Sequence, residues 1–248
     1  MTLGEQLVEE TDLSARANIK REFDNEFLQY VQFGGVIRSK NKESDFDQSS
    51  ADDDAGIETA DLFEGSGARN PFRRPVPGLS TSIFDFAQNN LPFEDDTVDS
   101  IIEDYETNED VQAAYLMASF NLADWEIIAG ARVERTDFDT EGFAYNEDTD
   151  TISAVGFEKD YTNFLPGVHL RREIADDFVF RASWTNTISR PTFEQSRPGI
   201  VREGNEVERG NPDLDPYEAV NFDTSIQYYN KTYGVFGAAI FHKDIENF

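Results

Sequence analysis

The sequence has no cysteine, which excludes disulfide scaffolds, thiolate metal sites and cysteine nucleophiles. Long apolar runs are also absent. The longest uncharged one, Gly234–Phe241, is far shorter than the ~20 residues that a membrane helix needs. The polar, acidic start of the chain lacks the basic and apolar regions of a secretory signal, so the chain is either cytoplasmic or a piece of a longer protein.

Positive charge is scarce, with 21 Lys and Arg against 50 Asp and Glu, a formal net charge of -29. This balance argues against nucleic acid as a partner, because contacts to phosphates require Lys and Arg. Most simply, the excess is a solvated surface. Residues 43–108 hold 17 acidic and 3 basic side chains, which is about half of the excess. We expect this segment to be an exposed lobe.

Extended segments dominate what is present, because apolar and polar residues alternate with a period of two. Most of the segments exceed ten residues, longer than the five or six typical of soluble sheets and near the length that crosses a bilayer at a tilt. Eight strands are predicted: Leu13–Glu22, Phe27–Asn41, Asp110–Leu122, Trp125–Phe138, Tyr161–Glu173, Phe178–Ser189, Tyr217–Tyr229 and Tyr233–Glu246.

The connections between these strands are unequal in a regular way. Short turns follow the first, third, fifth and seventh strands. Long connections follow the second, fourth and sixth: Lys42–Glu109, Asp139–Asp160 and Arg190–Pro216. Tight turns on one rim and long loops on the other are typical of outer-membrane β-barrels. The sequence therefore predicts an all-β, antiparallel meander of about eight long strands within a transmembrane barrel.

The segment Trp125–Val133 poses the question of which side of a strand faces the inside of the protein. Trp125, Ile127, Ala129, Ala131 and Val133 share one side, with Arg132 and Glu134 on the other. Alternation alone does not distinguish inside from outside. Strand length and loop asymmetry favour the apolar side facing lipid and the charged side facing a wet interior.

From about residue 110 onward the sequence resembles the β-barrel of TonB-dependent outer-membrane receptors. The resemblance rests on four segments in the order typical of that family: "VQAAYLMASFNLADWEIIAGARVERT", "NFLPGVHLRREIADDFVFRASWTNTISRPTF", "GNPDLDPYEAVNFDTSIQYY" with Pro212 and Pro216, and the final "GVFGAAIFHKDIENF". A weaker match, to a preceding hairpin, lies in "ARANIKREFDNEFLQYVQFGGVIRSKNK". The segment around residues 43–108 matches no known pattern.

The resemblance implies a 22-stranded barrel in the outer membrane, with a plug domain in the same chain. On this basis residues 1–248 are part of such a barrel, with a long extracellular loop at 43–108 and without the plug, so we expect a fragment. The implied function is energised uptake of a scarce solute, an oligosaccharide or a ferric siderophore. The implied partners are outer-membrane lipid, the solute, and the TonB complex acting through the missing plug.

Two other functions stay open at this point. The chain could be a soluble β-sandwich that binds carbohydrate, in which case the apolar sides of its strands would face a second sheet. It could also be a glycosidase, which needs two converging carboxylates. The sequence gives no reason to select such a pair, nor a Ser-His-Asp or phosphate-loop arrangement, so no catalytic residue and no enzymatic activity are predicted.

The resemblance points to candidate ligand residues in the long connections. Arg190, Arg197 and Asn211 fall in its most diagnostic segment, where an arginine could hold a ligand carboxylate through paired hydrogen bonds. The favoured alternative is that Arg190 and Asn211 fix the loop against the barrel wall or the plug. Three aromatic residues could stack on a sugar or catecholate, or pack loop tips together: Phe72, Phe143 and Tyr145.

Two tryptophans, Trp125 and Trp184, lie on the predicted lipid side and are expected to form a membrane-interface belt. No cofactor is predicted. In particular haem is disfavoured, since haem receptors carry a histidine between elements corresponding to Arg190 and Pro212, and none occurs there. No metal site is predicted either, because Asp45–Asp54 lacks the glycine and the distal glutamate of an EF-hand loop.

Overall fold

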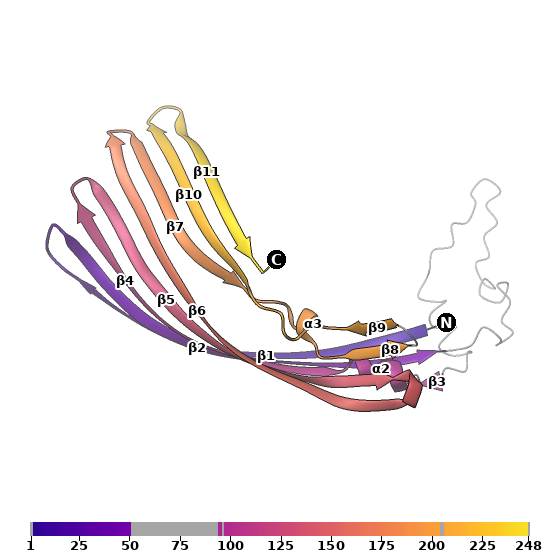
Figure 1. Cartoon of the computed structure of the whole chain (residues 1–248). Helices are drawn as coiled ribbons and strands as arrows, with labels where there is room; N and C mark the ends of the chain where they lie inside the picture. The colour runs from indigo at the N-terminus through magenta and orange to yellow at the C-terminus, as the bar shows by residue number, and fades with distance from the viewer. Residues whose placement is uncertain (1, 51–93, 96, 204–205, 248) are drawn as a thin grey trace, which may run out of the picture.

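A computed structural model describes residues 2–50, 94–95, 97–203 and 206–247. It contains a single sheet in which eight long strands follow one another in space as they do in the sequence, each antiparallel to the next (Figure 1). These strands are β1 (Thr2–Glu22), β2 (Leu28–Ser50), β4 (Tyr105–Leu122), β5 (Trp125–Asn146), β6 (Thr151–Ala175), β7 (Phe178–Ser189), β10 (Tyr217–Asn230) and β11 (Gly234–Glu246). The prediction of an all-β antiparallel meander is confirmed.

Short elements occupy the long connections. Two of three short strands pair with long ones: β3 (Glu94–Asp95) pairs with β2, and β8 (Ile200–Glu203) pairs with β5. The third, β9 (Glu206–Arg209), pairs with β8. The helical elements are α2 (Thr97–Glu103), the 3-10 turn η3 (Glu147–Thr149) and α3 (Phe193–Ser196). None of the helices in the described ranges is long and apolar enough to cross a membrane.

The long strands extend further into the connections than the sequence predicted. Residues 43–50 belong to β2 and residues 105–108 to β4, so the loop expected at 43–108 is shorter than predicted at both ends. Likewise β5 continues to Asn146, and β6 begins at Thr151. The β5 and β6 extensions pair with each other along their whole length, from Asp139 and Glu158 to Asn146 and Thr151, so that the neighbouring strand satisfies their backbone groups.

The sheet is strongly curved, with tight turns at one end and the long connections at the other (Figure 1). Side chains fix the tight turns: Asn25 Oδ1 accepts from the backbone N–H of Leu28 at 2.6 Å, and Asn230 Oδ1 accepts from Thr232 at 2.9 Å. β1 and β11 lie at the two ends of the strand order and do not pair with each other, so the sheet is open.

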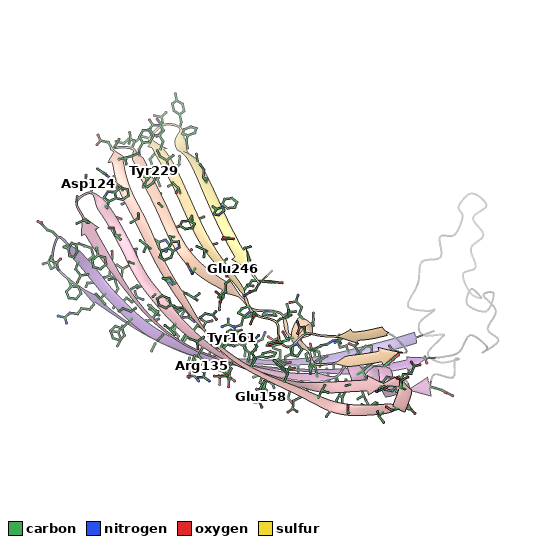
Figure 2. The ribbon with its side chains drawn as sticks, in the orientation of Figure 1. Asp124, Arg135, Glu158, Tyr161, Tyr229 and Glu246 are labelled. Carbon is green, nitrogen blue, oxygen red and sulfur yellow. The ribbon has the colours of Figure 1, made fainter. Side chains whose placement is uncertain are left out.

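The convex face of the sheet carries a band of apolar residues. Ala131 is level with Leu116 of β4 and Pro166 of β6, and Val133 is level with Phe164. Leu116 is 58% exposed and Phe164 63%, so no second sheet formed by the described residues covers them, contrary to the sandwich alternative. Along β5 the band extends from Trp125 to Val133. Beyond it the same face becomes charged, as Figure 2 shows for Arg135 and Glu158.

The concave face, from which Tyr161 projects in Figure 2, is polar. Among the described residues, the buried hydrophobic side chains are few: Ile102, Tyr105, Val111 and Val179. Buried polar residues outnumber them: Ser44, Thr107, Glu109, Ser119, Glu134, Thr136, Thr140, Asn163, Ser196 and Asn221. A sheet that is apolar outside and polar inside is the arrangement of a membrane barrel wall.

Candidate functional site

The connection after β7 folds back over the concave face. We name two of its parts, residues 190–199 and 210–216, the cap. α3 begins with a capping box, in which the Thr192 and Gln195 side chains each bond to the backbone of the other residue. Farther along, the carbonyl oxygens of Gln195 and Gly199 accept from the backbone N–H groups of Asn211 at 3.0 Å and Gly210 at 3.2 Å. The two arms of the cap are therefore joined.

Arg190 anchors the start of the cap to the sheet. Its guanidinium group donates to the carboxylate of Glu134 and, at 2.9 Å, to Thr136 Oγ1, both on β5. Its Nε lies 3.4 Å from Glu109 Oε2 on β4. Arg132 approaches the same Glu134 carboxylate at 2.6 Å. The charge of Arg190 is thus met by two carboxylates on the polar face of the barrel wall.

Glu109 lies beyond the apolar band, level with Phe138 of β5. Burial raises the pKa of the Glu109 carboxyl group, although the positive charges of Arg190, Arg38 and Lys40 act in the opposite direction. Its nearest cationic atom, Arg190 Nε, is a buried donor without a hydrogen-bond partner. Removing Arg190 would therefore leave Glu109 buried beside Glu134 without its nearest counter-charge.

Lys159 of β6 forms a second anchor, at the far arm of the cap. Its ammonium group donates to Asp215 Oδ1 at 2.8 Å, to the Asp213 carbonyl oxygen at 2.9 Å and to the Leu214 carbonyl oxygen at 3.3 Å. Burial lowers the pKa of Lys159, but hydrogen bonds and charge from Asp215 and Asp213 outweigh it, so that the pKa is raised overall. The sequence prediction missed Lys159.

α3 rests on the polar side of β2 and β5. The Lys40 ammonium group lies 4.7 Å from the centre of the Phe193 ring, and Lys42 forms an ion pair with Glu194 at 3.6 Å. The Phe193 ring also lies 6.4 Å from that of Phe138. A cation next to an aromatic face is favourable, so these contacts add to the anchors on either side of the helix.

The structure brings three of the predicted ligand residues together in the cap. Arg190 meets Glu134, and Arg197 donates to the carboxylate of Glu103 at the end of α2. Asn211 Oδ1 accepts from the backbone N–H of Asp213 at 3.2 Å and shapes the turn that Lys159 holds. The contact of Arg190 with β5 is of the kind that the anchoring role requires, whereas these contacts of Asn211 lie within the cap itself.

The aromatic candidates are not part of this cluster. Phe143 and Tyr145 lie on the outer side of β5, on the face opposite the cap, as the alternation from Ile127 requires. The Tyr145 hydroxyl lies 3.4 Å from Asp150 Oδ1 in the following turn. Phe72 falls outside the described residues.

The two tryptophans occupy different levels of the apolar band. Trp125 lies at the turn end of the band, where its ring contacts Phe180 edge-on at 6.0 Å and the Arg172 guanidinium group at 5.4 Å. Trp184 pairs with Val168, which is level with Ala129 near the middle of the band. The interface role predicted for Trp125 suits its position, whereas the position of Trp184 does not favour that role.

The family model described as TonB-dependent receptor-like β-barrel matches residues 4–248. The chain belongs to the TonB-dependent receptor β-barrel family. Barrels of this family are outer-membrane proteins, in agreement with the outward apolar band. No curated protein matches the sequence.

Solved receptor structures share the fold at low sequence identity. The copper transporter OprC is 13% identical, with a TM-score of 0.56. The match covers 98% of this chain and 31% of the OprC chain. The siderophore receptor PiuA from Acinetobacter baumannii is 13% identical, with a TM-score of 0.53. The match covers 95% of this chain and 32% of the PiuA chain. The hemophore receptor HasR of Serratia marcescens, solved with HasA and heme, is 10% identical, with a TM-score of 0.54. The match covers 99% of this chain and 34% of the HasR chain.

This TonB-dependent receptor barrel chain spans about a third of the length of those structures. At such identities the likeness concerns the fold alone. The relatives are transporters and receptors by name, and none of these names describes an enzyme.

Proposed function

We propose that the chain forms part of the wall of a receptor that takes up a scarce solute across the outer membrane, with energy relayed by TonB through a plug domain. The observation that carries the proposal is the cap, a long connection folded inward onto a polar concave face beyond an outward apolar band. Such a cap lies where a solute would enter the barrel. Membership of a receptor family supports uptake rather than catalysis.

The proposed solute is an oligosaccharide or a ferric siderophore. A siderophore receptor among the structural relatives supports the second, and the acidic, aromatic composition of the connections favours the first, a neutral ligand. Arg190 and Arg197 are already paired with Glu134 and Glu103, so a ligand carboxylate would have to compete for them. A saccharide, which hydrogen-bonds without needing a free cation, avoids that competition.

Uptake assays test the proposal. The receptor that carries this wall is expressed in cells that lack their own uptake systems, and accumulation of radioactive ferric siderophores and labelled oligosaccharides is measured with and without a protonophore. We expect accumulation of one of these solute classes, abolished by the protonophore and by deletion of TonB. Accumulation that survives both treatments, or none with either solute class, would contradict the proposal.

A further inference from the structure

Two connections that are distant in sequence meet beside the concave face. α2 precedes β4, and the cap follows β7, yet the Arg197 guanidinium group donates to the Glu103 carboxylate across a separation of 94 residues. Both side chains are partly buried, 27% and 39% exposed. An ion pair between partly shielded groups is stronger than one in open solvent, because water screens it less.

The backbones also approach each other closely at this junction. The buried Pro198 packs against Gly142 of β5, where an added Cβ would lie 3.1 Å from Pro198 Cγ and 3.3 Å from the Asp104 carbonyl oxygen. An added Cβ on Gly199 would lie 3.2 Å from the carbonyl oxygen of Ile102 in α2. The cap thus contacts the C-terminal end of α2 directly, with little space between them.

Each connection is also fastened to the sheet by contacts of its own. For α2, the backbone N–H of Gln48 donates to Ser100 Oγ at 2.8 Å, and that of Phe46 donates to Asp104 Oδ1 at 2.8 Å. The cap is held by Arg190 and Lys159, as described above. The junction at Arg197 is therefore not needed to place either connection. Its effect is to join them.

We propose that α2 and the cap form one coupled unit, in which a displacement of either connection is transmitted to the other through the Arg197–Glu103 ion pair and the contact of Pro198 and Gly199 with α2. A solute that contacts the cap would thereby alter the order of α2, and the reverse. The coupling is a property of the wall, and only its use in solute capture rests on the proposed function.

Hydrogen-exchange mass spectrometry on the receptor in lipid nanodiscs, without any solute, tests the coupling. For Arg197→Gln we expect exchange to accelerate about 1.4- to fivefold, as for the loss of a partly exposed ion pair, both in the cap and at residues 97–104. Glu103→Gln should accelerate the same two segments. The reversed pair, Arg197→Glu with Glu103→Arg, should return both to the original rates.

The matched control is Arg135→Gln, which removes ion pairs with Asp137 and Asp160 on the outer face and should change neither segment. Acceleration confined to the mutated segment, or failure of the reversed pair to restore the rates, would overturn the coupling. If Arg197→Gln does not insert into the membrane, Glu103→Gln provides the same test from the opposite side. Because no solute is present, failure of the uptake assay leaves this result unaffected.

Discussion

Arginine in place of Ala129 tests which face of the sheet meets lipid. Ala129 lies in the middle of the apolar band, level with Ala118 and Val168, four residues from either end. At ~3.3 Å per residue along a strand, the nearest wet edge is roughly 13 Å away. An arginine facing lipid near the midplane costs about 2–4 kcal/mol, which lowers the folding equilibrium constant about 30- to 700-fold.

The measurement is a urea titration of the receptor folded into lipid vesicles, followed by tryptophan fluorescence. Two control variants separate the effect of depth in the bilayer from the effect of the face of the sheet. Val133→Arg lies at the edge of the band and should cost about 0–1 kcal/mol. Ser183→Arg lies on the concave face, where the Ser183 hydroxyl is 3.4 Å from Asp223 Oδ2, and should cost little. If Ser183→Arg is as destabilising as Ala129→Arg, the assignment of the two faces is wrong.

Three further predictions concern the cap. Arg190→Met leaves the carboxylates of Glu109 and Glu134 buried without the cation that they share. It should lower the free energy of unfolding by about 3–5 kcal/mol in the same urea titration. An unchanged urea midpoint would show that these ion pairs are not buried. Gly210→Ala places a Cβ against the Arg197 carbonyl oxygen, so hydrogen exchange at Asn211 should accelerate, and unaltered protection would contradict that close approach. The pKa of Lys159 is raised in the folded protein. Lys159 should therefore stabilise the cap fully at pH values below its unfolded pKa of about 10.4, and this stabilisation should be lost as the pH rises through the higher folded pKa. A spin label at Pro212→Cys should then become mobile, a transition that Lys159→Met should abolish.

The strands that cross the apolar band were predictable from the sequence, because one side of each strand meets hydrocarbon and the other meets water. Phe178–Ser189 was predicted with the bounds that β7 has. The extensions of β5 and β6 were not predictable in the same way. Beyond the band, charged residues such as Asp139 and Glu158 interrupt the apolar alternation, so a period of two is harder to detect there.

The site was predictable only in part, for a related reason. Arg190, Arg197 and Asn211 were identified because they fall in the segment that is most diagnostic of the family resemblance. Their partners are brought near by strand register, and a single sequence does not specify which carboxylate among many faces a given arginine. Glu134 and Lys159 are such partners. A signal for Lys159 existed, since it is the only lysine or arginine between Arg135 and Arg171, and cations are scarce in this chain.

The small number of buried hydrophobic side chains determines how the protein must be handled. A water-soluble domain folds because burying apolar surface offsets the loss of chain entropy, but the described part of this chain gathers little of that surface inside. Its apolar side chains are turned outward, so the bilayer supplies the burial. We therefore expect the protein to collect in inclusion bodies when produced without membranes, and to regain its strands only once an amphiphile such as a detergent micelle covers its convex side.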